Sequence, residues 1–136
     1  MRFSLLKTFV PVSCISVVLM FQSGAIAAHH SGEMFDSQRT LTLQGVVKEF
    51  QYVNPHSWLI VDVTHDDGRV ETWGFEAEGP STLRRAGIRP SDFRAGTEVT
   101  ITGRPMKDGR PAAAWVDAVR TEDGKRFDPR EGFQVR

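Results

Sequence analysis

The chain has 136 residues, with 17 basic and 17 acidic side chains, and carries no net charge when its histidines are neutral. This balance is not typical of proteins that bind nucleic acid through its phosphates, so we expect no nucleic-acid partner. The single cysteine, Cys14, lies in an N-terminal segment that we expect to be removed, which excludes disulfides and thiol chemistry from the mature protein.

Residues 1–27 have the pattern of a cleavable secretory signal peptide. A basic start is followed by an apolar stretch that is shorter than the ~20 residues needed to span a bilayer as a helix. Ala25 and Ala27 then form the small-x-small motif that signal peptidase recognises, which predicts cleavage between Ala27 and Ala28. Cleavage after Ala28 is the alternative. We therefore expect a periplasmic or secreted protein with no membrane span after signal removal.

Cleavage leaves 109 of the 136 residues, which is enough for one small domain. It removes Arg2 and Lys7 from the 17 basic residues, so 15 remain against 17 acidic residues, a net charge of −2. We divide the mature chain into an N-terminal arm, residues 28–40, and a domain, residues 41–136.

The domain begins with a long predicted strand, residues 41–52. Its apolar phase slips along its length, so we expect a bulge or bend near Gly45. Alternating apolar residues or runs of β-formers predict four more strands, at residues 58–63, 70–77, 99–101 and 113–120. The large apolar residues of the last of these are Trp115 and Val119. A short sixth strand is expected near residues 125–127.

Three Asp-Gly pairs, at residues 67–68, 108–109 and 123–124, predict hairpin turns, because glycine readily adopts the positive φ that such turns require. Residues 79–87 begin with Gly-Pro and end with glycine, which is typical of a short helix. A helix after the third strand predicts an all-β, OB-like Greek-key barrel of five or six antiparallel strands. An open antiparallel sheet with a helix on one face is the alternative.

The histidines gather in two short segments, one at the start of the mature chain and one at the first turn of the domain. If cleavage precedes Ala28, its amine, the next two backbone amides and the His30 imidazole can offer four nitrogens to Cu(II) or Ni(II). If cleavage precedes His29, its own amine and imidazole can chelate one ion, and His56 or His30 can complete a T-shaped copper site. The two cleavage sites thus predict different metal sites.

Each histidine also has an interpretation without a metal. The first residues of a domain are often disordered, and Asn54-Pro55 favours a turn in which His56 would only hydrogen-bond the loop. His65 is expected to be a solvated loop residue. We predict that His29, His30 and His56 bind Cu(II) in a non-enzymatic binding module. The alternative is a metal-free barrel that binds a small ligand or a protein partner.

Four further residues are expected to support this site. Asn54 and Glu76 can orient an imidazole through a hydrogen bond, as metal-ligating histidines usually require. Trp58 and Trp73 can stack on a small ligand, because OB-fold barrels bind oligonucleotides and oligosaccharides on the faces of their strands.

Two further pairs of residues, one apolar and one acidic, have their own interpretations. Met34-Phe35, an apolar pair in a polar segment, is expected to anchor the arm to the barrel. Glu76 and Glu78 are two residues apart, so their backbones lie ~6.6 Å apart on one strand face, near the carboxylate separation of inverting glycosidases. Alternating acidic residues near a strand end are usually a solvated face, and the sequence shows no third group that would raise one of the two pKa values. The sequence has no nucleophile elbow, phosphate-binding loop or dinucleotide fingerprint, so we expect no enzyme.

Several motifs together resemble an uncharacterised family of exported bacterial proteins that is catalogued as a domain of unknown function. The matching features are His29-His30-Ser31, Phe35-Asp36, Gly45, Asn54-Pro55-His56-Ser57-Trp58, Trp73-Gly74-Phe75-Glu76, the helix from Pro80 to Arg85, and Gly103. The resemblance implies an OB-like barrel and a periplasmic location in Gram-negative bacteria, and it implies no known activity. In that family the histidine pair often follows the cleavage motif directly, whereas here Ala28 intervenes.

Overall fold

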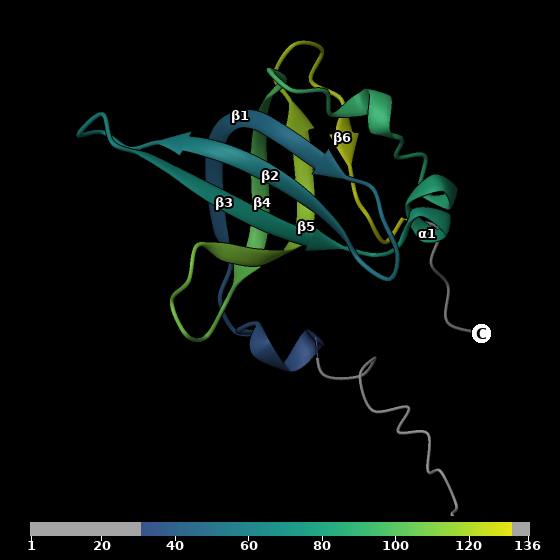
Figure 1. Ribbon diagram of the computed structural model, residues 1–136, viewed down its shortest axis with the longest axis horizontal. Coiled ribbons are helices and arrows are strands. Elements are labelled where there is room, and N and C mark those ends of the chain that lie inside the picture. Colours follow the sequence, from purple (N-terminus) through teal and green to yellow (C-terminus); the bar gives the residue numbers. More distant parts are fainter. Residues whose placement is uncertain (1–30, 132–136) are drawn as a thin grey trace, which may run out of the picture.

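The computed structural model describes residues 31–131 (Figure 1). Its elements, in chain order, are a 3-10 turn (Ser31–Met34), β1 (Leu41–Gln51), β2 (Ser57–Thr64), β3 (Val70–Ala77), α1 (Pro80–Arg85), a second 3-10 turn (Pro90–Asp92), β4 (Glu98–Pro105), β5 (Ala112–Arg120) and β6 (Arg126–Phe127). The expected signal peptide, together with His29 and His30, lies outside the described residues. Among the helices of residues 31–131, none is long and apolar enough to cross a membrane.

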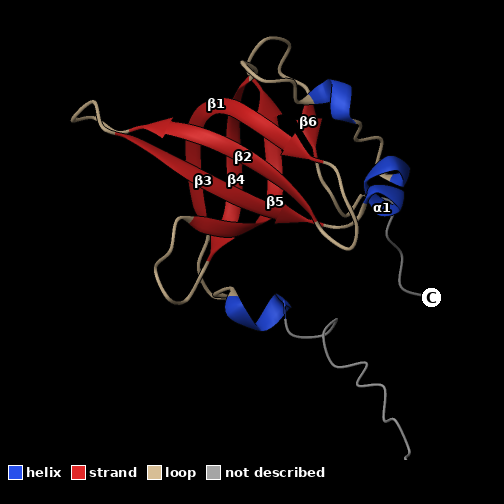
Figure 2. Cartoon of the chain, viewed as in Figure 1, coloured by secondary structure: helices blue, strands red, loops and turns tan. Residues whose placement is uncertain are grey.

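Strands β1 to β5 form a closed barrel. In the order β3-β2-β1-β4-β5 each strand pairs antiparallel with its neighbour, and a parallel pairing of β3 with β5 completes the ring. Strand β6 pairs with β5 outside the ring. Figure 2 shows the strands wrapped around one interior, with α1 at one end. The predicted OB-like barrel with one short helix between the third and fourth strands is confirmed, and the open sheet is excluded.

β1 belongs to both halves of the barrel because it pairs with β4 over residues 41–46 and with β2 over residues 46–51. Its register with β2 shifts at Lys48, so the predicted irregularity is a bulge just beyond Gly45. At Gly45 itself a Cβ would lie 2.6 Å from the carbonyl oxygen of Asp62. The missing side chain therefore lets β1 pass close to β2.

The three Asp-Gly pairs form the turns β2–β3, β4–β5 and β5–β6, as predicted. Their glycines have φ values of +80°, +80° and +68°. In each turn the aspartate carboxylate accepts a hydrogen bond from the backbone N–H two residues later, which belongs to an arginine or a lysine. One local pattern, Asp-Gly-Arg/Lys, thus sets all three hairpins.

The barrel interior is filled by the inward faces of the strands and closed at one end by α1. Leu83 of α1 and the following Ile88 are fully buried. The Tyr52 hydroxyl lies within hydrogen-bond distance of the carbonyl oxygens of Pro80 and Ile88, which ties the helix to the end of β1. The largest fully buried strand and loop side chains are Val47, Leu59, Val61, Phe75, Phe93, Val99 and Ile101.

The pairing of β3 with β5 closes the barrel through only three residue pairs, from Gly74↔Ala112 to Glu76↔Ala114; we call this stretch the β3–β5 seam. Next to the seam, β4 and β5 also approach closely, since a Cβ at Gly103 of β4 would lie 2.7 Å from that of Ala113. Just beyond the seam, the register of β5 with β4 shifts at Val116. Trp115 and Ala118 are buried as a result, and the buried face does not continue from Trp115 to Val119.

Candidate functional site

The described part of the N-terminal arm docks beside the β3–β5 seam. Phe35 is 6% exposed and forms a β-bridge with Met106. The Asp36 N–H donates to the Pro105 carbonyl oxygen at 2.8 Å, and the Lys107 N–H donates to the Met34 carbonyl oxygen at 2.9 Å. The Met34 side chain is 40% exposed, so Phe35 alone buries its side chain as an anchor.

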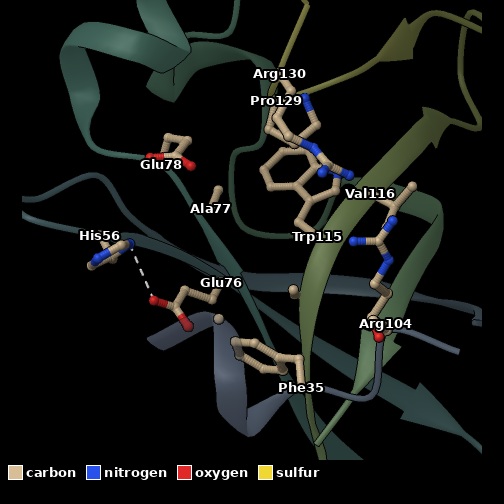
Figure 3. A pocket seen from close by; sticks show the side chains of 13 residues that line it. Phe35, His56, Glu76, Ala77, Glu78, Arg104, Trp115, Val116, Pro129 and Arg130 are labelled. Atoms are coloured by element: carbon tan, nitrogen blue, oxygen red, sulfur yellow. Dashed lines mark ion pairs between the residues drawn. The ribbon is translucent and has the colours of Figure 1, made fainter. Parts of the chain in front are cut away.

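A pocket of about 220 Å³ lies where the pairing of β3 with β5 ends (Figure 3). Its lining comes from the arm, from the loop before β2, from the end of β3 and the residue after it, and from β4, β5 and the C-terminal segment. The lining residues are Gly32, Phe35, Ser37, His56, Glu76, Ala77, Glu78, Arg104, Ala114, Trp115, Val116, Pro129 and Arg130. The pocket therefore exists only once the barrel has closed and the arm has docked.

His56 and Glu76 form an ion pair at one side of this pocket (Figure 3). The imidazole Nδ1 lies 3.1 Å from the carboxylate Oε1, and the glutamate side chain is only 9% exposed against 30% for the histidine. Burial raises the pKa of Glu76; the charge of His56 opposes this rise, and that of Glu78 adds to it. The second oxygen, Oε2, is buried without a hydrogen-bond partner among the described residues.

The His56–Glu76 pair is arranged so that the histidine can bind a further group. Because Nδ1 is turned toward Glu76, the other ring nitrogen, Nε2, is left for a metal or a ligand, as in carboxylate–histidine–metal triads. Within residues 31–131, no group of three metal-ligating side chains occurs. A metal at His56 would therefore need ligands from beyond the described part of the chain.

The opposite side of the pocket is basic. Figure 3 shows the guanidinium groups of Arg104 and Arg130 across the pocket from His56, Glu76 and Glu78. We call these two groups of residues the basic wall and the acidic wall. Sequence reasoning did not single out the two arginines. Residue alternation in β4 indicates that Arg104 faces outward, but only barrel closure shows that it faces Glu76.

The other predicted site residues lie outside the pocket lining. Trp58 is opposite Glu76 in the β2–β3 register and packs over Gly74, where a Cβ would lie 3.2 Å from the indole. Trp73 lies at 6.2 Å from Phe75, ring centre to ring centre. Asn54 lies against Gly79, where a Cβ would be 3.0 Å from its side-chain oxygen. The structure thus brings Glu76 to His56 and leaves these three residues beside the pocket.

A second histidine–glutamate pair lies toward the tip of the same β2–β3 hairpin. His65 Nε2 is 3.0 Å from Glu71 Oε2, and both side chains are 32% exposed. The Trp73 indole donates to the same oxygen at 2.9 Å. Hydrogen bonds from Trp73 and His65 lower the pKa of Glu71. His65 is therefore a partly buried member of a polar cluster rather than only a solvated loop residue.

Comparison with known proteins gives a family and no function. Residues 17–114 match the model of DUF6152, a family of unknown function. No curated protein and no solved structure matches the chain. The matched residues include the arm, the acidic wall and most of the strands, and they make up more than half of the sequence. The chain belongs to the DUF6152 family.

Proposed function

We propose that this protein is a non-enzymatic periplasmic binding module that holds a copper ion between its N-terminal histidines and His56. The observation that carries the proposal is that Gly32, from the arm, and His56, from the barrel, line the same pocket. His30 is two residues before Gly32 in the sequence, and consecutive Cα atoms are about 3.8 Å apart. An imidazole at position 30 can therefore reach the pocket that contains His56.

The His56–Glu76 pair supports the same proposal. A ligating histidine usually donates its second ring N–H to a carboxylate, which fixes the ring and makes the free nitrogen more basic. Glu76 is placed for this role, with Oε1 at 3.1 Å from Nδ1. A buried carboxylate also partly offsets the charge of a bound cation in a site of low polarity.

The position of signal cleavage sets the remaining ligands. Cleavage before Ala28 supplies an amine, two amides and the His30 imidazole, a nitrogen set that suits tetragonal Cu(II). Cleavage before His29 supplies an amine and an imidazole from one residue, with His56 as the third nitrogen. The second arrangement depends on His56 more strongly than the first.

The alternative function is a metal-free barrel that binds a small ligand or a protein. The pocket of about 220 Å³, with arginines and carboxylates on opposite walls, favours a small ligand over a protein.

Copper titration of the processed protein tests the metal proposal, with native mass spectrometry to read the cleavage site and the stoichiometry. We expect one Cu(II) per chain. In protein cleaved before His29, His56→Ala should weaken binding about 100-fold and Glu76→Gln about tenfold, because ligands and their carboxylate partners contribute on this scale. In protein cleaved before Ala28, both losses should be smaller, since the terminus alone supplies four nitrogens. His65→Ala is the matched control and should bind like the wild type, since His65 lies on a different cluster.

The alternative results are equally informative. Equal affinities of wild type and His56→Ala would remove His56 from the site and leave a chelate formed by the terminus alone. Absence of binding by the wild type would leave the metal-free function.

A further inference from the structure

The pocket contains polar groups of both signs that have no partner within the described chain. Glu76 Oε2 is buried and accepts no hydrogen bond there. The side chains of Arg104 and Arg130 make neither a hydrogen bond nor an ion pair with any other residue in the range 31–131. A buried carboxylate oxygen without a partner is costly, whereas Arg104 is partly buried and Arg130 is exposed, so both guanidinium groups can reach a ligand or water.

The acidic and the basic side chains of the pocket also come from different parts of the chain. Glu76 and Glu78 come from the end of β3, whereas Arg104 comes from β4 and Arg130 from the C-terminal segment. In Figure 3 the carboxylates and the guanidinium groups lie on opposite sides, with Trp115 between them and Phe35 below. A molecule that contacts both walls must therefore carry a cation at one end and an anion at the other.

We propose that this pocket binds a small zwitterion, with its amine against Glu76 and Glu78 and its carboxylate at Arg104 and Arg130. Guanidinium groups bind carboxylates through two parallel N–H donors, and an ammonium group donates readily to a buried carboxylate oxygen. Apolar carbons between the two charges would lie against Trp115 and Phe35.

The size of the pocket limits the length of this ligand. Pockets for drug-sized ligands have volumes of about 300–1,000 Å³, so a pocket of about 220 Å³ suits a shorter molecule. 4-Aminobutyrate, an amine and a carboxylate joined by a short chain, is therefore a suitable probe.

Zwitterion binding does not depend on copper. Glu76 uses Oε1 toward His56, whereas the atom offered to the amine is Oε2. The two proposals can thus fail separately when the zwitterion is tested with EDTA present and copper absent.

Isothermal titration of the metal-free protein with 4-aminobutyrate tests the proposal, with butyrate and butylamine as probes that each lack one charge. We expect a dissociation constant of about 1 mM or lower for 4-aminobutyrate, and binding about tenfold weaker for each single-charge probe. Arg104→Met and Glu76→Gln should each weaken 4-aminobutyrate about tenfold.

Arg94→Met is the matched control, because Arg94 is exposed and lies outside the pocket lining. It should bind like the wild type. Arg104 is only partly buried, so its variant keeps the test decisive even if Glu76→Gln fails to fold. Equal binding of butyrate or butylamine, wild-type affinity in Arg104→Met, or no binding of 4-aminobutyrate at about 10 mM would each overturn the proposal.

Discussion

The β2–β3 hairpin carries two histidine–glutamate pairs of nearly equal length in opposite environments. His56–Glu76, at 3.1 Å, lies under the docked arm, and its glutamate is 9% exposed. His65–Glu71, at 3.0 Å, lies toward the hairpin tip, and its glutamate is 32% exposed. The pKa of Glu76 is raised by burial, whereas that of Glu71 is lowered by hydrogen bonds from Trp73 and His65.

The difference shows that the surroundings of such a pair, and not its length, decide what the pair can do. Glu71 is held within a local cluster by His65 and the Trp73 indole, so this pair stabilises the hairpin. Glu76 keeps one buried oxygen without a partner in the described chain, and the residue lines a pocket. Within the described residues, the His56–Glu76 pair therefore keeps unused capacity to bind another group, and the His65–Glu71 pair does not.

Removing the Phe35 side chain, which anchors the arm, should have the largest effect on the difference between the two histidine–glutamate pairs. Phe35→Ala should lower the free energy of unfolding by about 3 kcal/mol, because Phe35 is almost fully buried against the barrel. It should also bring the pKa of Glu76 closer to its ordinary value, by letting water reach the carboxylate.

Urea unfolding and an NMR titration of Glu76 measure these two effects. Met34→Ala is the control, since the exposed Met34 side chain should contribute less than about 0.5 kcal/mol. An equally small effect for both substitutions would contradict the packing of Phe35.

Replacing each glutamate by glutamine should give opposite dependences on pH. The raised pKa of Glu76 means that the unfolded chain ionises first, so stability is lost as pH rises above the ordinary glutamate pKa. Glu76→Gln removes this loss and should raise the stability relative to the wild type at pH 7 and not at pH 3.

The lowered pKa of Glu71 contributes stability above the ordinary glutamate pKa, and this contribution is lost as pH falls through the lowered value. Glu71→Gln should therefore destabilise the protein at pH 7 and not at pH 3. Thermal unfolding at both pH values measures the two variants. Glu98→Gln, at an exposed strand position, is the control. If Glu76→Gln and Glu71→Gln changed the stability at pH 7 in the same direction, the contrast between the two pairs would be refuted.

The smallest expected effect concerns the His65–Glu71 pair, near the tip of the β2–β3 hairpin. Trp73→Phe retains the ring beside Phe75 but removes the donor to Glu71, so the pKa of Glu71 should rise toward its ordinary value. The melting temperature should fall by about 2 °C. Trp58→Phe is the matched control and should leave the NMR titration of Glu71 unchanged. An unchanged Glu71 titration in Trp73→Phe would show that the indole does not set this pKa.

Much of the fold could be predicted from local signals. The three Asp-Gly turns, the alternation in β2 and the Pro-to-Gly helix each depend on neighbouring residues, and each was predicted at its observed place. The irregularity in β1 lies slightly after the predicted position. Gly45 allows the close approach of β1 to Asp62, and the register shifts only at Lys48. Which residue carries a bulge depends on the partner strand, which no local pattern specifies.

Less of the site than of the fold could be predicted from the sequence. His56 and Glu76 were both named from the sequence, and the antiparallel pairing of β2 with β3 brings them into contact. Arg104 and Arg130 were not named, because their place opposite Glu76 arises from barrel closure and from the path of the C-terminal segment. Contacts between residues this far apart in sequence leave no periodic signal.

The β3–β5 seam gives the barrel a preferred place to open. It has three residue pairs, whereas β2 and β3 share eight, so local opening should cost least free energy there. Opening separates the pocket walls, because Glu76 belongs to β3 while Arg104 belongs to β4, which stays paired with β5. A molecule that contacts both walls must therefore leave before the strands part, so its binding slows the opening of the barrel itself. Amide hydrogen exchange in residues 112–114 reports that slowing directly.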